Sequence, residues 1–229
     1  REVFKFGYPL LDDMIKRYKP SKGKKTTILI APSWQKDNII DICLDGILER
    51  LKNSNYKIII RPHPQYIKYD KDRIKYLKEK YKENTNVIVE MDFSTNISVF
   101  DANLLITDWS DIAFEYAFTT KKPVLFIDTP MKVMNPEYKK IDIEPFNIWI
   151  RDKIGIIVRL NELDKIDSII KTMLKSSKEY YKVINEILDE NVYNIGNSAE
   201  IGSNYIIKCI QNKVSERCEN NEYKDKEIK

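Results

Sequence analysis

The sequence predicts an α/β fold, a Rossmann-like parallel sheet with helices on both faces, followed by C-terminal helices. Three observations favour this fold. Short runs rich in β-branched residues alternate with longer stretches of helical periodicity, which is typical of βαβ units. The runs are apolar nearly throughout, as expected for strands that helices cover on both faces. No internal repeat is visible, so the alternation describes one sheet and not an array of repeats.

Six strands are expected, each from one short apolar run. They cover residues 26–31, 57–61, 86–90, 103–107, 123–128 and 155–159. Helices are expected between them and after the last one, at about 38–52, 70–82, 97–102, 111–120 and 162–212. A Gly/Asn break in the segment "NIGNSAEIG" precedes the last helix. The connections are therefore helical crossovers, as parallel strands require.

One segment of the chain, residues 129–153, is long and irregular and contains three prolines. Loops of this length are often binding loops or lids. Glu144, Pro145 and Phe146 could border a base or a substrate. Alternatively, the segment is a surface loop that Phe146 and Trp149 anchor.

Composition gives weaker information about partners. The 39 Lys and Arg exceed the 35 Asp and Glu by only four charges, so no strong field argues for nucleic acid binding. Three widely spaced cysteines form neither a disulfide framework nor a zinc motif, which favours a reducing compartment. No apolar run approaches the roughly 20 residues of a membrane span. We therefore expect a soluble or peripheral protein without nucleic acid as a partner.

Polar and aromatic residues follow the strands at the edge where ligands bind in open α/β sheets, beyond the carboxyl ends of the strands. The segments are "APSWQK" (31–36), "RPHP" (61–64), "TDWSD" (107–111) and "DTP" (128–130). The topology alone brings them to one edge. Ser33 in the first segment either sets a turn or approaches a diphosphate together with the loop backbone.

His63, the only histidine of the chain, lies between two prolines directly after a strand. The prolines stiffen the backbone, so the imidazole is held in place near the strand end. Near its ordinary pKa of about 6.5, histidine can donate to a phosphate oxygen or transfer a proton. Arg61, two residues earlier on the same side of the strand, could add a positive charge. The alternative is a histidine hydrogen-bonded at a turn.

The segment "LLITDWSDIAFEYA" places a strand end directly before a helix. Ser110 can cap this helix or offer its hydroxyl to a ligand, and free N–H groups at a helix start bind phosphate. Glu115 lies about one turn after Asp111, within reach of a sugar hydroxyl. In the alternative interpretation, Ser110 is only a cap and Asp108 only closes a turn. Asp111 argues against a phosphate, because its carboxylate would compete with it.

The ordered set of segments resembles the CDP-glycerol glycerophosphotransferase family, the teichoic-acid and capsule polymerases of bacteria. The resemblance rests on "FGYPLLD", "ILIAPSWQ", "IIIRPHP", "LLITDWSDIAFEYA" and "KKPVLFID", and it covers about residues 6–128. A weaker similarity lies at "NIGNSAEIGSNYII". The resemblance implies a two-domain GT-B glycosyltransferase fold, of which this chain is the nucleotide-binding half.

The resemblance also implies an activity. Family members transfer glycerol phosphate, or a related polyol phosphate, from a CDP donor to a hydroxyl of a polymer or lipid-linked primer and release CMP. By position, His63 matches the essential histidine of this domain, and Thr107, Asp108 and Ser110 match a "TDYSS" segment that binds diphosphate. The sequence departs from the family pattern in having Asp111 in place of Ser, Glu115 in place of Asp, and Gln35 in place of Arg. These departures leave the identity of the donor open.

The domain organisation follows from the same resemblance. The family's amino-terminal domain carries a second histidine in an "HGTP" segment, which this sequence lacks. We therefore expect residues 1–25 to be a linker from that domain, 26–212 to be the nucleotide-binding domain with C-terminal helices, and 213–229 to be a charged, disordered tail. A location at the inner face of the cytoplasmic membrane is a family expectation.

Neither a metal nor another cofactor is required, because no Asp/Glu/His cluster with metal-ligand spacing is visible. Two other functions stay open from the sequence. One is a nucleotide-sugar glycosyltransferase or epimerase of the same architecture, since a phosphate-binding strand end does not select the donor. The other is a non-catalytic nucleotide-binding or assembly domain.

Overall fold

The computed structural model describes residues 3–20, 23, 25–133 and 135–226. The chain forms two units. The larger is Tyr18–Ile187, and the smaller joins Arg1–Arg17 to Leu188–Lys229. These limits differ from the predicted domain of residues 26–212, whose boundaries stay a prediction.

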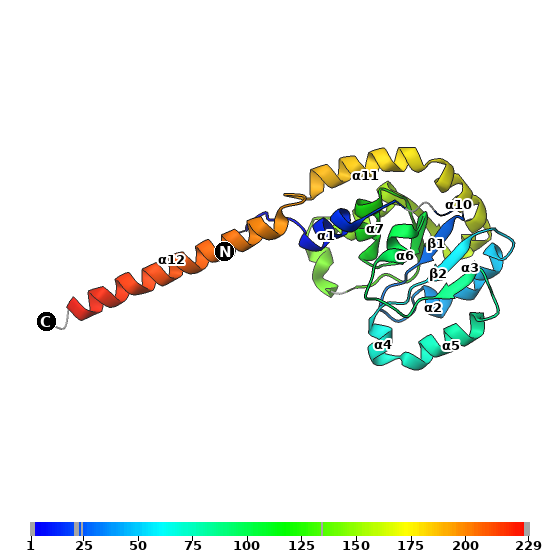
Figure 1. Cartoon of the computed structure of the whole chain (residues 1–229), viewed down its shortest axis with the longest axis horizontal. Coiled ribbons are helices and arrows are strands. Elements are labelled where there is room, and N and C mark those ends of the chain that lie inside the picture. The colour runs from blue at the N-terminus through cyan, green and yellow to red at the C-terminus, as the bar shows by residue number, and fades with distance from the viewer. Residues whose placement is uncertain (1–2, 21–22, 24, 134, 227–229) are drawn as a thin grey trace. The chain divides into compact units, whose positions relative to one another are not determined.

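The larger unit is built on a parallel sheet (Figure 1). In the described residues its six strands are β1 (Thr27–Ile30), β2 (Lys57–Ile60), β3 (Val87–Val89), β4 (Leu104–Thr107), β5 (Val124–Asp128) and β6 (Gly155–Arg159). The order across the sheet is β3-β2-β1-β4-β5-β6, and every pair is parallel. In register, Ile28 lies between Ile58 and Leu104. The predicted parallel sheet is confirmed, with each strand within a residue or so of its expected limits.

Helices connect the strands as predicted, with three differences, of which the first is the unpredicted helix α4. The helices of this unit are α2 (Ile39–Ile42), α3 (Leu44–Leu51), α4 (Gln65–Tyr69), α5 (Lys71–Tyr81), α6 (Ile97–Asp101), α7 (Ile112–Thr120), α8 (Phe146–Trp149), α9 (Arg151–Ile154), α10 (Ile166–Lys175) and the start of α11 (Ser177–Asn191), with 3-10 turns η1 (Pro136–Lys140) and η2 (Leu160–Lys165). The expected helix 38–52 is divided at Cys43, whose φ of −144° is not helical. The segment 129–153 is less irregular than predicted, because proline starts η1 and immediately precedes α8.

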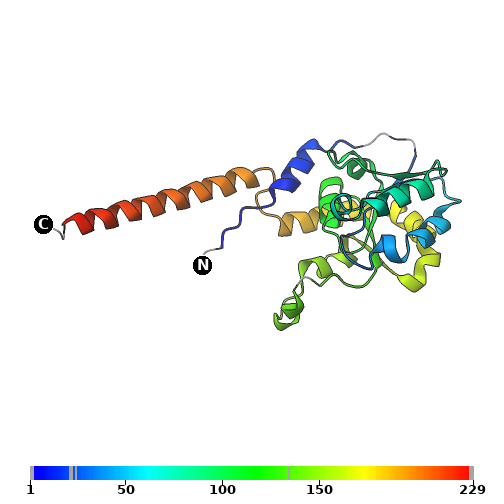
Figure 2. The same ribbon diagram turned by 90° about the horizontal axis from the view of Figure 1, so that it is seen from below.

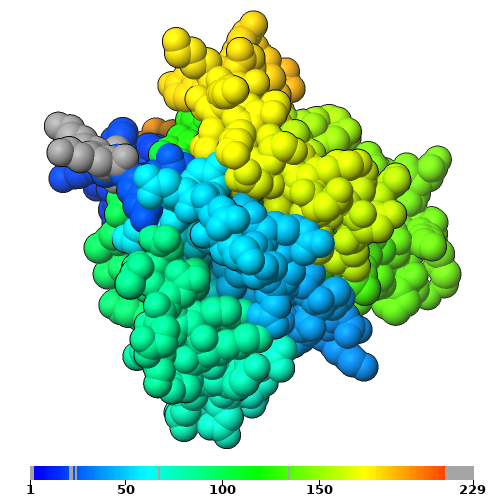
Figure 3. Space-filling view, turned by 90° about the vertical axis from the view of Figure 1, so that its right-hand side faces the viewer, coloured from blue at the N-terminus to red at the C-terminus, as the bar shows by residue number. Residues whose placement is uncertain are grey.

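The core follows the alternation of side chains along the strands. Ile28 and Ile30 of β1 point to the same face as Ile58 and Ile60 of β2, and this face packs on α3, α5 and α10. Figure 3 shows α3 between α5 and α10 on this side of the molecule. The intervening residues face α6 and α7, where Tyr116 is fully buried. Helices therefore cover both faces, as the apolar strands predict.

The smaller unit contains α1 (Pro9–Arg17) and the continuous helix α12 (Ser198–Lys226) (Figures 1 and 2). The Asp12 carboxylate accepts hydrogen bonds from the backbone N–H groups of Gly196 (2.7 Å) and Ser198 (3.0 Å). Residues 1–25, predicted as a linker, thus include a helix that is bound to the turn before α12. Positions 1–2, 21–22 and 24 of this predicted linker lie outside the described residues.

The predicted tail also differs from the structure. α12 continues through most of residues 213–229, which were expected to be disordered. The sequence after Gly202 contains neither glycine nor proline, so nothing in it terminates the helix. Residues 227–229 lie outside the described part of the chain. Among the helices that are described, none combines the length and the apolar character needed to cross a lipid bilayer.

Gly155 is required by the close pairing of β5 and β6. A Cβ atom at this position would lie 1.6 Å from the carbonyl oxygen of Val124. We expect Gly155→Ala to lower the free energy of unfolding by about 3 kcal/mol, because the two strands would have to separate. Urea denaturation measures this change.

Gly46 provides the matched control for this substitution. It lies within α3, where an added Cβ would meet only the flexible end of Arg50 at 3.4 Å. Gly46→Ala should raise the free energy of unfolding by about 0.5–1 kcal/mol, because alanine favours the helix. Equal effects of the two substitutions would contradict the tight pairing at Gly155.

Candidate functional site

The loops that follow β1, β2 and β4 enclose a cavity of about 330 Å³ at the carboxyl edge of the sheet. Its walls are formed by Ala31, Pro32, Ser33, Trp34, Arg61, Pro62, His63, Pro64, Asn96, Ser110, Asp111, Ile112, Glu115 and Lys132. Six of the eight predicted site residues are among them. The other two, Thr107 and Asp108, do not line the cavity. The convergence expected from the topology is therefore present, and we call this cavity the donor cavity.

His63 is held by the turn between β2 and α4. Its Nδ1 accepts a hydrogen bond from the backbone N–H of Gln65 at 3.2 Å. A neutral ring whose Nδ1 accepts carries its proton on Nε2, which is then a hydrogen-bond donor. The ring of Trp34 lies nearby, with 6.4 Å between the ring centroids. His63 is thus a positioned donor in the wall of the donor cavity.

Burial lowers the pKa of His63 below its ordinary value of 6.5, and the positive charge of Lys132 lowers it further. The imidazole is therefore neutral at pH 7 in the free protein. Because the folded state has the lower pKa, protonation opposes folding. The contribution of His63 to stability is complete above pH 6.5 and is lost as the pH falls through the pKa of the folded state.

This arrangement predicts the titration of His63. As the sole histidine, it gives one resolved imidazole C2–H signal, whose midpoint we expect below 6.5 in the free protein. A bound diphosphate should raise the midpoint, because negative charge favours the protonated ring. Lys132→Gln should also raise the midpoint of the free protein, whereas Lys139→Gln, outside the cavity, should not. A midpoint above 6.5 in the free protein would contradict the structure.

Arg61 lines the donor cavity, but the carboxylate of Glu90 balances its charge. Its Nη1 pairs with Glu90 at 2.6 Å and donates to Ser98 at 3.1 Å, and its Nη2 donates to the carbonyl of Thr95 at 3.1 Å. The side chain is 8% exposed. Arg61 therefore ties the end of β2 to the segment before α6. Glu90 compensates the positive charge that Arg61 was expected to add, and direct phosphate contact by Arg61 stays a prediction.

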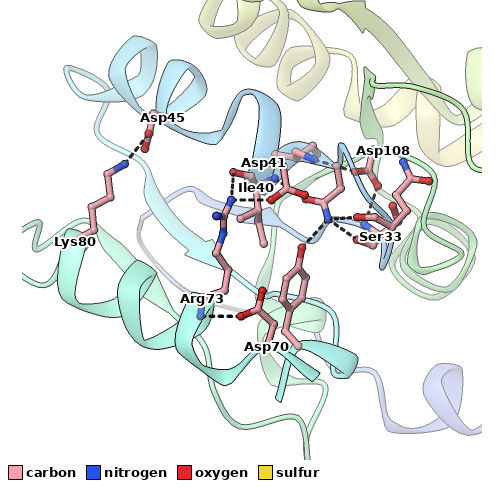
Figure 4. A network of polar contacts seen from close by, with 12 residues as sticks. Ser33, Ile40, Asp41, Asp45, Asp70, Arg73, Lys80 and Asp108 are labelled. Carbon is pink, nitrogen blue, oxygen red and sulfur yellow. Dashed lines mark hydrogen bonds and ion pairs between the residues drawn. The ribbon is translucent and has the colours of Figure 1, made fainter. Parts of the chain in front are cut away.

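Thr107 and Asp108 hold the loop after β1 in place without lining the cavity. The Thr107 hydroxyl donates to the carbonyl of Ala31 at 2.6 Å. The carboxylate of Asp108, 1% exposed, accepts hydrogen bonds from the backbone N–H groups of Ser33 (2.7 Å), Trp109 (2.7 Å) and Ile39 (3.1 Å). Figure 4 shows Asp108 directed at Ser33. These two residues fix the loop after β1 to the end of β4, so they are positioning residues in this structure.

The loop after β1 is held on its other side as well. The Asn38 side chain donates to the carbonyls of Ser33 and Gln35 and to the hydroxyl of Tyr66 at 2.6 Å. Polar contacts also join α2 and α3 to α5, including the pairs Arg73–Asp41 and Lys80–Asp45 (Figure 4). The loop is therefore preorganised before any ligand binds.

Ser33 has an unusual environment within this rigid loop. Its hydroxyl is buried in the wall of the donor cavity and has no hydrogen-bond partner in the described part of the chain. An unpartnered buried hydroxyl costs about 1–3 kcal/mol. A ligand oxygen in the cavity would supply the partner. The side chain is thus a candidate ligand contact, as the sequence predicts.

The start of α7 contributes Ser110, Asp111 and Glu115 to the cavity. Asp111 occupies the N-cap position, and its side chain makes no capping hydrogen bond. The prediction that Ser110 caps this helix is therefore wrong by one residue. No side chain caps α7, and the N–H groups of Ala113 and Phe114 donate to the carbonyls of Ser110 (3.2 Å) and Asp111 (3.0 Å). What this helix start offers an anion is the positive end of its dipole. Glu115 lies one turn further along the same wall, as expected.

The residues that sequence reasoning missed are Asn96, Lys132 and Arg151. Lys132 lies in the donor cavity and also in a smaller cavity of about 140 Å³ that includes Pro145. Glu144 and Phe146, expected beside a substrate, line neither cavity. No local pattern distinguishes Lys132 from the other lysines. Only its place in the long segment after β5 was a signal.

Arg151 stabilises the loop that carries Ser110. Its guanidinium lies 3.8 Å from the centroid of the Trp109 ring, and Trp109 Nε1 donates to the carbonyl of Thr129 at 2.9 Å. The guanidinium is 3.8 Å from the Asp128 carboxylate and has no hydrogen-bond partner among the described residues.

Across the described chain, no three His, Cys, Asp or Glu side chains lie together as metal ligands.

Comparison with known proteins decides the family. Residues 1–194 match the sequence model of the CDP-Glycerol:Poly(glycerophosphate) glycerophosphotransferase family. The chain belongs to this family. It is 24% identical over 236 residues to the minor teichoic acid biosynthesis protein GgaB of Bacillus subtilis, covering 91% of this chain. It is 26% identical over 160 residues to the teichoic acid glycerol-phosphate primase of the same organism, covering 62% of this chain.

The chain spans only 24% of the first relative and 37% of the second. Among solved structures, the UDP-GlcNAc 2-epimerase of Methanocaldococcus jannaschii, determined with UDP-GlcNAc and UDP, superposes with a TM-score of 0.53 at 18% identity. The match covers 91% of this chain and 54% of the epimerase chain. This likeness concerns the fold and confirms half of a GT-B architecture.

Proposed function

We propose that this chain is the donor-binding domain of a glycerophosphotransferase. The reaction transfers glycerol phosphate, or a related polyol phosphate, from a CDP-activated donor to a hydroxyl of a cell-wall or capsule polymer. The observation that carries the proposal is the donor cavity. It brings together the Nε2–H of His63, the unpartnered hydroxyl of Ser33 and the uncapped start of α7. The family membership identifies the class of donor.

These groups suit the charge of a diphosphate. In the transfer, the acceptor oxygen bonds to the phosphorus of glycerol phosphate, the bond to the bridging oxygen breaks, and CMP leaves with that oxygen. The developing charge on CMP requires hydrogen-bond donors that are already in place. His63 Nε2–H is such a donor, and the positive end of the α7 dipole lies in the same wall. Lys132 adds a positive charge to the same wall.

The partners of the reaction belong to the proposal as well. The acceptor is a polymer or a lipid-linked primer, and its hydroxyl proton needs a base that we expect from the amino-terminal GT-B domain of the family. This chain alone is then expected to bind the donor without turnover. Peripheral attachment at the inner face of the cytoplasmic membrane would bring the domain to a lipid-linked acceptor.

A second candidate is a nucleotide-sugar glycosyltransferase or epimerase, because the UDP-GlcNAc 2-epimerase shares the fold and a phosphate-binding strand end does not select the donor. Calorimetry distinguishes the two. We expect CDP-glycerol to bind at least about tenfold more tightly than UDP-GlcNAc. The reverse preference would overturn the proposal in favour of the second candidate. Binding of neither nucleotide would indicate a non-catalytic assembly domain.

A further inference from the structure

Another cavity lies at the amino ends of β4 and β5, at the other end of the strands from the donor cavity. Its volume is about 420 Å³. Asn103 in its wall directly precedes β4, and Lys122 lies two residues before β5. These positions are at the amino ends of the strands, whereas the donor cavity is at the carboxyl ends. The two cavities are therefore separate sites, and we call the second one the lysine cavity.

The lysine cavity is positively charged. Three lysines line it, Lys121, Lys122 and Lys178, and no carboxylate does so among the described residues. Such a concave wall of one charge sign attracts anions. Asn103, Ser177 and Tyr181 can donate hydrogen bonds to an anion, whereas the Thr120 hydroxyl already donates to the carbonyl of Tyr116 at 2.8 Å.

Backbone carbonyls hold two of the three lysines. Lys121 follows α7 with a left-handed φ of 59°, and its ammonium donates to the carbonyl of Phe118. The Lys122 ammonium donates to the carbonyls of Ala102 (2.5 Å) and Phe100 (3.4 Å). A carbonyl group has no net charge, so these hydrogen bonds fix the ammonium groups and leave them protonated. Lys122 uses two of its three donors in this way, which leaves one for a ligand.

Burial of Lys122 gives an anion a further reason to bind. Burial lowers the pKa of Lys122, and the nearby Asp101 opposes this shift. The charged ammonium is thus destabilised by its surroundings in the free protein. An anion in the cavity would compensate for part of this cost.

Lys178 has no structural partner of this kind. Its side chain makes no hydrogen bond or ion pair within the described part of the chain. Lys178 lies in the first turn of the 15-residue helix α11. α11 begins at Ser177, two residues after the last residue of α10, Lys175. A lysine, hydroxyl groups and a helix start form a combination that suits the oxygens of a phosphate.

We propose that the lysine cavity binds a phosphate group, carried by a small molecule such as glycerol phosphate or by a lipid headgroup. The proposal does not depend on the function of the donor cavity. It rests on the three lysines, on a wall without a carboxylate and on the start of α11. Lys178 is the lysine of the wall whose ammonium is not engaged by the described residues.

Two-dimensional NMR of the whole chain tests this site. Titration with sn-glycerol 3-phosphate and, separately, with inorganic phosphate should shift the amide signals of Lys121, Lys122, Ser177 and Lys178 in a saturable way. Lys178→Glu should weaken this binding at least tenfold. Lys182→Glu is the matched control, because it makes the same charge change one turn further along α11 at a side chain that is 79% exposed. It should leave the binding unchanged.

Sedimentation with phosphatidylglycerol vesicles, against phosphatidylcholine vesicles, distinguishes the two sources of phosphate. Binding to the anionic vesicles that Lys178→Glu removes and Lys182→Glu retains would identify a lipid headgroup as the ligand. The absence of both the saturable amide shifts and this vesicle binding would overturn the proposal. Equal losses in the two variants would overturn it too, because they would indicate a nonspecific charge effect.

Discussion

Replacing Asp108 by alanine is expected to lower the free energy of unfolding by about 3 kcal/mol and to remove nucleotide binding. The buried carboxylate accepts three backbone N–H bonds, from Ser33, Trp109 and Ile39. Without it, donors in a buried loop lose their partners, at about 1–3 kcal/mol for each unsatisfied group. The loop would also lose the geometry that places the Ser33 hydroxyl in the donor cavity. Urea denaturation and calorimetry with CDP-glycerol measure the two effects.

Asp111 is the control for this substitution. It lies three residues later and is exposed, and its side chain makes no capping hydrogen bond. Asp111→Ala should change the stability by less than about 1 kcal/mol. The stability of Asp108→Asn should lie between those of Asp108→Ala and Asp111→Ala, because the asparagine amide keeps one accepting oxygen. If Asp108→Ala is as stable as Asp111→Ala, the anchoring role of Asp108 is wrong.

His63→Ala is expected to weaken binding of CDP-glycerol by about 10-fold to 100-fold. The lost hydrogen bond from Nε2 to a charged phosphate is worth about 1.5–3 kcal/mol. Calorimetry at pH 7.5, where the free imidazole is neutral, measures the loss. The fold should persist, since the ring accepts one hydrogen bond, from the N–H of Gln65, and otherwise lies beside Trp34.

His63→Asn separates ligand contact from local structure. The asparagine carbonyl can accept from the N–H of Gln65, and its amide can donate to a phosphate. We expect this variant to be as stable as the wild type and to bind CDP-glycerol more tightly than His63→Ala does. Lys36 lies in the neighbouring loop, after β1, and outside the cavity wall. Lys36→Ala should therefore bind CDP-glycerol normally. Unchanged binding by His63→Ala would show that the histidine does not contact the donor.

The strands and the shared edge of their loops were predictable, because they depend on local apolar runs and on the rules of parallel sheets. Six of the cavity residues were predicted at this edge of the sheet for the same reason. The roles of Arg61 and Asp108 were not predictable. Their partners are determined by the folded chain, since Glu90 lies 29 residues from Arg61 and Ser33 lies 75 residues from Asp108.

The other differences also have physical causes. Lys132 is one of 39 basic residues and carries no local pattern that identifies it. The charged, apolar-poor composition after residue 212 predicts disorder, but the same residues contain no glycine or proline to end α12. Nothing in the sequence near Arg151 marks it as buried, and in the folded chain its guanidinium packs on the rings of Trp109 and Phe126.

The central claim is that the donor cavity binds the diphosphate of a CDP-activated polyol. Amide NMR of the whole chain with CDP-glycerol tests it most directly. The account predicts saturable shifts confined to the loops at 31–36 and 61–64, the start of α7 and Lys132, together with a raised pKa of His63. Shifts elsewhere with these loops unchanged, or no shifts at saturating CDP-glycerol, would contradict it.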